Sequence, residues 1–175
     1  NKILAQNKIN QYFTGPEIVH YHNAPRYWIR AMTFTPYFWN ERDGEKMSSQ
    51  IKSLNTSNKE NAKIITAVLN SSLFYWWFIL FSDSRHLNMR EVKRFSLSID
   101  KMKSNHKEAL LDLCDQLMDD YKKNAKRKEC YYRKTGKVIY DEFYPRFSKN
   151  IIDEIDKILA LHYGLTDEEL DFIIN

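Results

Sequence analysis

Glycine, proline and cysteine are scarce in this chain of 175 residues, which has four glycines, four prolines and two cysteines. None of the glycines belongs to a nucleotide-binding fingerprint, so a phosphate-cradling loop is excluded. Cys114 and Cys130 are too few for a disulfide framework or a cysteine metal site, and this usage is typical of a reducing cytoplasm. The longest apolar run, residues 73–81, is too short to cross a bilayer, and no signal-peptide pattern is present.

Aromatic residues make up 14% of the chain, which indicates an ordered globular protein and not a disordered tail. A chain of this length can bury a substantial core in one domain. It starts at Asn1 without a methionine and stops at Asn175 inside an apolar pattern. We therefore expect a fragment of a longer protein.

The formal net charge of +4 is unevenly distributed along the chain. Residues 85–103 contain six basic and two acidic residues, and residues 122–137 contain eight basic and one acidic. Residues 151–175 contain one basic and seven acidic residues. This pattern predicts a cationic face for a polyanion and a separate, acidic end. Ordinary solvent-exposed helix faces have the same composition. From composition alone, exposed helix faces are favoured over a polyanion-binding face.

The first third of the chain predicts short strands. Residues 26–38 are rich in β-branched and aromatic side chains and predict a strand, which Pro36 ends. Residues 40–44 form a polar turn, and the alternation in residues 49–54 predicts a second strand. His20 and His22 would share one strand face, but without a third ligand they favour ordinary histidines over a metal site.

The middle of the chain predicts two consecutive helices. Ser57 to Glu60 has the form of a capping box, so a helix begins at Ser57 and continues to Asn70. Ser71 or Ser72 then caps a second helix through residue 81, which is apolar nearly all round and should be buried. Beyond it, residues 88–91 predict a helical turn, and the alternation in residues 95–99 predicts a strand.

The last third predicts mostly helices. A long helix runs from Asn105 to about Lys128 and ends in a basic cluster that suits its dipole. Residues 138–144 predict a strand, Ser148 caps the next helix, and Gly164 ends it. The last helix has Thr166 and Glu169 as a capping box, so its acidic cluster is a helix start and not a metal site.

Together these elements predict an α+β fold, in which a small mixed β-sheet packs with helices and the C-terminal half is helical. We place the boundary between a recognition region, residues 1–104, and a helical region, residues 105–175. The second region comprises the long spacer helix, a strand or loop, and two helices.

Covalent chemistry has little support in the sequence. Glu91 and Lys93, with Asp83 upstream, are the nearest match to a metal-dependent nuclease, but the spacing is short and both lie in a predicted turn. Cys114 lies on the apolar stripe of its helix and is expected in the core. We therefore predict no catalytic residues and no metal site, and keep a nuclease as an alternative.

Nucleic-acid reading has better support. Arg85, His86, Asn88 and Arg90 lie within six residues and have side chains that can read base edges. The cations that follow, Lys93 and Arg94, suit phosphate contacts. A polar loop that merely connects two elements is an equally good interpretation of the same residues.

A resemblance decides between these interpretations. Residues 69–78 combine Leu-Asn-Ser with an aromatic helix and are followed by Arg85, His86 and Asn88. This arrangement resembles the target recognition domain of bacterial restriction–modification enzymes, and most closely the C-terminal specificity domain of TaqI-like adenine-N6 DNA methyltransferases. Residues 48–52 and 152–173 are similar to the same family. The specificity subunits of type I restriction systems carry related domains.

The resemblance covers residues 27–175 and implies a module that selects the DNA sequence. The catalytic domain, with its Asn-Pro-Pro-Tyr motif and S-adenosylmethionine loop, would lie elsewhere in the parent polypeptide, which would methylate a flipped adenine. The implied partners are double-stranded DNA and that catalytic domain, and this fragment itself would bind no cofactor. Recognition residues vary from member to member of the family. The resemblance therefore implies that Arg85, His86 and Asn88 occupy the recognition position, but it assigns no base contact to any of them. The candidate DNA-binding residues are Arg42, Lys46, Ser48, Ser49, Lys52, Arg85, His86, Asn88, Arg90, Lys93, Arg94, Lys126 and Arg127.

Overall fold

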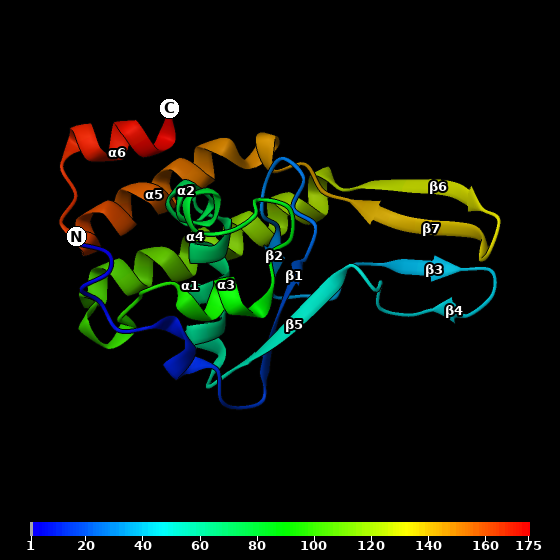
Figure 1. The fold of residues 1–175 in the computed structure, drawn as a ribbon, viewed down its shortest axis with the longest axis horizontal. Helices are drawn as coiled ribbons and strands as arrows, with labels where there is room; N and C mark the ends of the chain where they lie inside the picture. The colour runs from blue at the N-terminus through cyan, green and yellow to red at the C-terminus, as the bar shows by residue number, and fades with distance from the viewer. Residues whose placement is uncertain (1) are drawn as a thin grey trace.

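A helical body and a projecting β-arm make up the protein in the computed structural model, which describes residues 2–175 (Figure 1). The β-arm is a four-stranded antiparallel sheet with the order β4-β3-β7-β6. Its strands are β3 (Phe38–Asn40), β4 (Gly44–Glu45), β6 (Lys126–Tyr132) and β7 (Gly136–Glu142). A smaller antiparallel sheet lies in the body with the order β2-β1-β5. Its strands are β1 (Glu17–His22), β2 (Ala31–Met32) and β5 (Ile51–Thr56).

The helices form the rest of the body. Helices α4 and α5 both pack against α1, and α1 also contacts β1 and β2. Figure 1 places α6 and the β-arm at opposite ends of the molecule, so the acidic residues at the start of α6, Asp167 to Glu169, lie far from the arm. The helical elements are η1 (Ile9–Tyr12), α1 (Lys59–Asn70), α2 (Ser72–Phe81), α3 (Met89–Arg94), η2 (Ile99–Lys101), α4 (Ser104–Asn124), η3 (Pro145–Ser148), α5 (Lys149–Tyr163) and α6 (Asp167–Ile174).

The α+β class is confirmed, with helices dominating the C-terminal half. In place of a single mixed sheet there are two sheets, and every strand pairing is antiparallel. The expected boundary between residues 104 and 105 falls after the first residue of α4, Ser104. Elements from its two sides share structure, because β3 pairs with β7 and α1 packs on α4.

The junction of α1 and α2 is anchored by Asn70, which is fully buried. Its amide nitrogen donates to the carbonyl oxygens of Ala31 and Thr66, each at 2.8 Å. Its amide oxygen accepts from the Ala31 N–H at 3.1 Å and the Tyr121 hydroxyl at 2.8 Å. One side chain thus uses its four hydrogen-bonding positions to join α1, β2 and α4.

The start of α2 is capped twice, as a buried helix end requires. Ser71 accepts a hydrogen bond from the Phe74 N–H at 3.0 Å, which confirms the predicted break and cap. The buried Asp156 carboxylate of α5 accepts the N–H groups of Ser72 and Leu73, each at 3.1 Å. A negative charge at this position also suits the positive end of the α2 dipole.

Helix α2 is buried over its first half only. Phe74 and Trp77 are buried and pack edge-on against Phe95. The last turn is different, because Ile79, Leu80 and Phe81 are 46%, 55% and 48% exposed. The prediction that the whole helix lies in the core is therefore correct for its first two turns and wrong for its last.

Two predicted strands are much shorter in the structure. Residues 26–38 contribute only β2 and the first residue of β3. Arg26 has a positive φ of 58°, and prolines on both sides lack an N–H for a ladder, so the segment forms loops. Residues 95–99 do not form the predicted strand. Only a single antiparallel bridge, between Lys8 and Ser96, joins them to the N-terminal segment. All five residues are buried, the serines included, because Ser96 and Ser98 form hydrogen bonds with Lys8 and Asn7 of the N-terminal segment.

The basic cluster at the end of α4 is divided between the helix and a strand. Lys122 and Lys123 lie in the last turn of α4, where they suit its dipole as predicted, whereas Lys126, Arg127 and Lys128 lie on β6. Helix α4 ends at Asn124, and residues 126–128 belong to β6, which pairs with β7 along its whole length. The predicted extension of the helix to about Lys128 is wrong, because the β7 partner provides hydrogen bonds that the local sequence does not reveal.

Most of the predicted caps are confirmed, but Ser148, at the N-cap position of α5, makes no capping hydrogen bond and donates its hydroxyl to Asp120. Asn58 and not Ser57 caps α1, by accepting the Asn61 N–H at 2.8 Å. Gly164 ends α5 in the left-handed conformation that favours glycine. Thr166 and Glu169 cap α6 reciprocally.

Among residues 2–175 there is no single helix long and apolar enough to cross a membrane; α1 and α2, bent by 66° between them, meet that test together by length and composition only.

Candidate functional site

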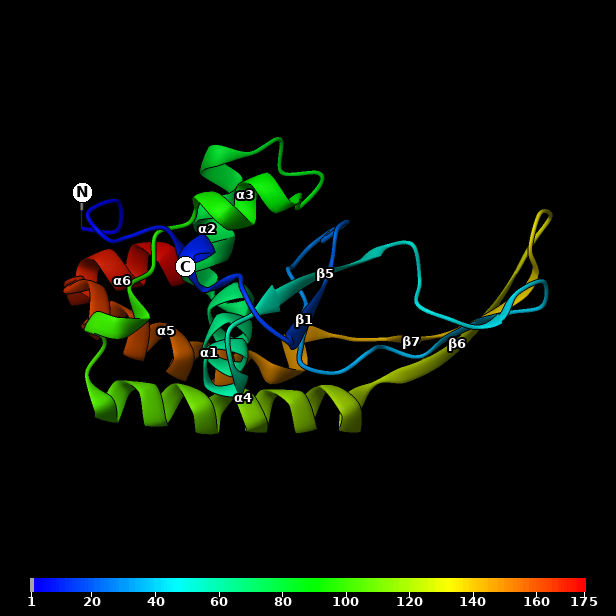
Figure 2. The same cartoon turned by 90° about the horizontal axis from the view of Figure 1, so that it is seen from below.

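A cavity of about 310 Å³ lies at the root of the β-arm, where the arm joins the body. We call it the root cavity. Its walls come from the end of β1, the segment before β5, and strands β3 and β7. Figure 2 shows the tip of the arm bending towards the side on which α3 and its preceding loop lie. Residues 48–51, which include the predicted recognition residues Ser48 and Ser49, line the cavity, whereas none of the residues 82–94 does.

Backbone hydrogen bonds bring the two predicted recognition segments together. The Asn23 N–H donates to the Gln50 carbonyl at 2.9 Å, and the Leu87 N–H donates to the Asn23 carbonyl at 2.8 Å. Ser48 and Ser49 line the root cavity directly. The loop of residues 82–88, which we call the α2–α3 loop, is thus attached beside the cavity through Asn23.

The α2–α3 loop is ordered by its own polar groups. The Asp83 carboxylate accepts the N–H groups of Arg85 at 2.9 Å and His86 at 3.1 Å, and these bonds lower the pKa of Asp83. Ser84 adopts a positive φ of 55°, which tightens the turn. Arg85 and His86 are exposed. The loop therefore presents two polar side chains on a fixed backbone.

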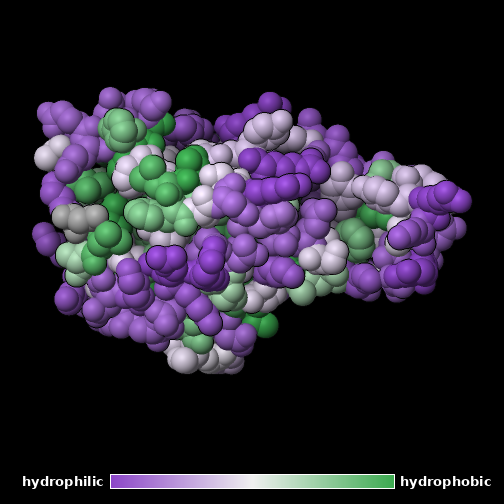
Figure 3. Space-filling view, in the orientation of Figure 1, coloured by the Kyte–Doolittle hydropathy of each residue, from purple (hydrophilic) through white to green (hydrophobic). Residues whose placement is uncertain are grey.

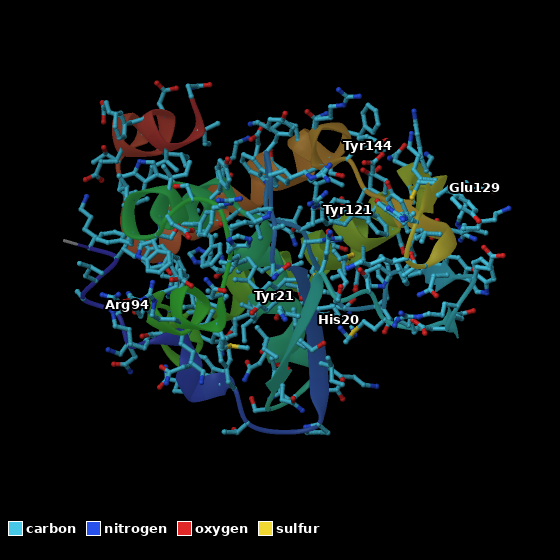
Figure 4. The ribbon with its side chains drawn as sticks, turned by 45° about the vertical axis from the view of Figure 1, so that its right-hand side comes forward. His20, Tyr21, Arg94, Tyr121, Glu129 and Tyr144 are labelled. Carbon is cyan, nitrogen blue, oxygen red and sulfur yellow. The ribbon has the colours of Figure 1, made fainter. Side chains whose placement is uncertain are left out.

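Helix α3 uses part of its predicted site for its own structure. Glu91 is 3% exposed and accepts the Asn88 N–H at 3.1 Å. The exposed Arg90 guanidinium is bound to the same carboxylate at 2.8 Å. Lys93 and Arg94 are exposed on the last turn. Figure 4 shows Arg94 on the opposite side of the view from Glu129 of the arm, so Arg94 lies far from the arm.

The nuclease alternative rests on Glu91 and Asp83, and both carboxylates are bound by neighbouring donors of the same loop and helix. Within residues 2–175 there is no group of three or more His, Cys, Asp or Glu side chains that could hold a metal ion. His20 instead bonds the hydroxyls of Ser53 at 2.9 Å and Thr35 at 3.1 Å.

The β3–β4 hairpin carries two of the predicted cations beside an acid. Asp43 pairs with Arg42 at 2.9 Å and with Lys46 at 2.7 Å. Hydrogen bonds from Arg42, Lys46 and Asn40 hold the pKa of Asp43 well below its usual range. These three residues sum to a charge of +1, but Glu41 and Glu45 of the same hairpin bring residues 38–46 to a formal charge of −1. Lys52 is exposed on β5, opposite Tyr21 in the ladder.

Strand β6 carries the remaining predicted cations. The Arg127 guanidinium binds both oxygens of Asp141, at 2.5 and 3.1 Å, and lies 3.9 Å from the ring centre of Tyr37. The Lys126 ammonium lies 5.5 Å from the ring centre of Tyr144. Figure 3 shows a largely hydrophilic surface over the arm, and the apolar residues gather on the body. Arg127 is thus held by the sheet, whereas Lys126 has no carboxylate partner within residues 2–175.

Three residues that sequence reasoning did not select have unusual surroundings. His22, Arg26 and Arg30 all line the root cavity. The side-chain atoms His22 Nε2 and Arg30 Nε are buried and have no hydrogen-bond partner among the described residues. Burial, then the charges of Arg30 and Arg26, lower the pKa of His22 to about 3.

Arg26 and Arg30 also line a second cavity of about 500 Å³, with Glu142 and Phe143 shared between the two cavities. The two arginines therefore stand on the wall between the cavities. The sequence signal was available, since two arginines bracket an aromatic stretch at residues 26–30, but interpretation of this stretch as a strand concealed it.

Comparison of the chain with protein-family models, with curated proteins and with solved structures finds no match.

Proposed function

We propose that this chain is a sequence-specific DNA recognition domain of a restriction–modification adenine-N6 DNA methyltransferase. The observation that carries the proposal is the convergence of two polar segments beside the root cavity. Asn23 joins the α2–α3 loop to the segment that holds Ser48 and Ser49, and Arg26 and Arg30 lie in the same cavity wall. Duplex DNA would lie between the α2–α3 loop and the β-arm, against cations from both.

Within this proposal, readout and positioning fall to different residues. Arg85 and His86 are exposed on an ordered loop, and an arginine on a rigid loop suits the paired acceptors of guanine. Asn88 donates to the His86 carbonyl at 3.3 Å and helps hold that loop. Exposed cations without a carboxylate partner, such as Lys52, Lys93, Arg94 and Lys126, suit phosphate contacts.

The methyl transfer itself would be performed by a catalytic domain elsewhere in the same polypeptide, in the cytoplasm. That domain would bind S-adenosylmethionine and the flipped adenine. A specificity subunit of a type I restriction system would use the same recognition surface with a catalytic subunit on a separate chain.

Selection from a pool of randomised duplexes tests the proposal. The labelled chain is mixed with duplexes that carry a random central stretch, and bound DNA is recovered and sequenced over several rounds. A recognition domain enriches one short motif and binds it about a thousandfold or more tighter than random duplex. Binding without enrichment, or no binding at low salt, would contradict the proposal.

A second candidate function, protein docking, is favoured by the exposed last turn of α2. Ile79, Leu80 and Phe81 are each about half exposed and adjacent. Contiguous exposed apolar residues commonly mark protein interfaces. Association that ignores salt, requires no DNA and is abolished by Leu80→Ser would favour docking over DNA recognition.

A further inference from the structure

The root cavity is lined by the half-buried Arg30, whose guanidinium forms no ion pair with a carboxylate of the described residues and feels the Glu142 carboxylate only at longer range. Its Nε is buried and unbonded, and its Nη2 makes only long contacts, 3.3 Å to the Ala24 carbonyl and 3.4 Å to the Pro25 carbonyl. A partly buried charge without an ion-pair partner destabilises a protein, so such an arrangement indicates a position kept for a ligand.

The cavity wall holds two further side chains that can donate hydrogen bonds, and two carboxylates, those of Asp141 and Glu142. His22 lines the cavity and has a buried, unbonded Nε2, and Arg26 adds a second guanidinium. Both carboxylates of the wall have partners outside this group: Asp141 is bound by the Arg127 guanidinium, and Glu142 is bound by the Tyr144 hydroxyl and lies 3.8 Å from the Lys128 ammonium. Three side chains that can donate hydrogen bonds therefore line one cavity whose carboxylates are bound to other residues.

We propose that His22, Arg26 and Arg30 form a phosphate-binding subsite. A tetrahedral oxyanion matches the guanidinium geometry, because each arginine can donate two parallel hydrogen bonds to its oxygens. The Nε2 of His22 would donate a further hydrogen bond. The cavity of about 310 Å³ is larger than one phosphate group, so the bound phosphoryl group can carry a substituent that extends out of the cavity.

Two sources can supply this chemistry. One is a backbone phosphodiester of the bound duplex, in which case the subsite deepens the proposed function and rests on it. The other is a free phosphorylated small molecule. The attachment of the α2–α3 loop beside the cavity, through the hydrogen bond from the Leu87 N–H to the Asn23 carbonyl, favours the phosphodiester, because that loop carries the proposed reading residues Arg85 and His86.

Protonation of His22 provides a direct readout. The groups that face it across the cavity are Arg26, Arg30, Tyr132, Tyr140, Asp141 and Glu142. In the free protein, burial and the two arginines keep His22 neutral. A bound phosphate neutralises those arginines and accepts from Nε2, so the pKa of His22 rises.

The experiment follows the imidazole carbon resonances of the five histidines by NMR, with His22→Gln to assign His22. The whole chain is titrated with inorganic phosphate against chloride at equal ionic strength. A saturable shift of His22, with a raised pKa, is expected in the wild type and in the charge-matched control Lys157→Met on α5, which does not line the cavity. Arg30→Met should weaken phosphate affinity by about tenfold or more. Arg26→Met removes an exposed residue and gives the same test if Arg30→Met does not fold.

The outcomes separate the subsite from the proposed function. An unmoved His22 resonance, or equal phosphate affinity in wild type and both arginine variants, overturns the subsite even if DNA binds. Phosphate binding that duplex DNA displaces supports the phosphodiester as occupant. Phosphate binding that DNA does not displace supports a free phosphorylated molecule, and phosphate binding by a chain that binds no DNA supports the subsite while contradicting the proposed function.

Discussion

The Tyr121 hydroxyl of α4 donates a hydrogen bond of 2.8 Å to the amide oxygen of Asn70, at the end of α1. Both residues are buried, and the same Asn70 side chain holds both backbone groups of Ala31 in β2. This contact fixes where α1 stops, and hence where α2 and the α2–α3 loop begin. The recognition surface thus depends on a polar group in the middle of the core.

Replacing Asn70 should therefore cost more than an ordinary surface change. Asn70→Ala leaves the Ala31 N–H and the Tyr121 hydroxyl buried without partners, and we expect a loss of about 3 kcal/mol or more in the free energy of unfolding. Tyr121→Phe removes one bond and should cost about 1 kcal/mol. Chemical denaturation measures both, with the exposed Asn150→Ala as the control. Equal stability of Asn70→Ala and the control would contradict this role.

Asp156 makes the stability depend on pH. Burial raises its pKa to about 6, although the Ser72 and Leu73 N–H groups oppose that shift. Because the folded-state pKa lies above the unfolded value, its contribution is fully present below the unfolded pKa and is lost as pH rises through about 6.

Asp156→Asn, which cannot ionise, isolates that contribution. The stability of the wild type relative to the variant should fall by about 2–3 kcal/mol between pH 4 and pH 7. Urea titrations of both proteins across this range measure the difference, and other titrating groups cancel. If the difference in unfolding free energy between wild type and variant stays constant or grows with pH, the Ser72 and Leu73 N–H groups lower the pKa of Asp156 by at least as much as burial raises it.

His22 should have the opposite pH dependence. Its pKa is lowered to about 3 in the folded protein, so its contribution is present above the unfolded value near 6.5 and is lost as pH falls. Between pH 7.5 and pH 5 the wild type should lose about 2 kcal/mol relative to His22→Gln. Thermal and urea unfolding at the two pH values check this. Added phosphate should reduce the loss if the subsite is occupied.

Lys126 is expected to act through charge alone. Lys126→Ala should weaken cognate and random duplex binding by similar factors, and should reduce the slope of log affinity against log salt by about 0.9. Lys157→Ala on α5, where the ammonium is paired with Glu154, is the matched control. Loss of cognate binding alone would show that Lys126 reads bases and not phosphates.

Local signals in the sequence were sufficient for most helices. Ser71 and the pair of Thr166 and Glu169 are caps whose hydrogen bonds involve residues only three positions away, so their patterns can be read locally. Gly164 ended α5 for an equally local reason.

The β-arm could not be predicted in the same way. Strand β6 is predominantly polar, and its partner β7 is itself paired with β3, nearly a hundred residues earlier in the chain. Such pairings depend on tertiary context more than on local propensity.

Parts of the site also depend on long-range contacts. The position of the α2–α3 loop was predicted, but its attachment through Asn23 was not. His22 and Arg30 became candidates only because folding partly buries both beside one cavity and leaves Nε2 and Nε without partners.

The most direct test of DNA recognition uses Arg85. Once selection has defined a preferred duplex, the affinities of wild type and Arg85→Ala are measured for that duplex and for a scrambled one at fixed salt. The recognition account predicts that Arg85→Ala loses about 1–3 kcal/mol on the preferred duplex and almost nothing on the scrambled one. Equal losses on both duplexes would contradict it.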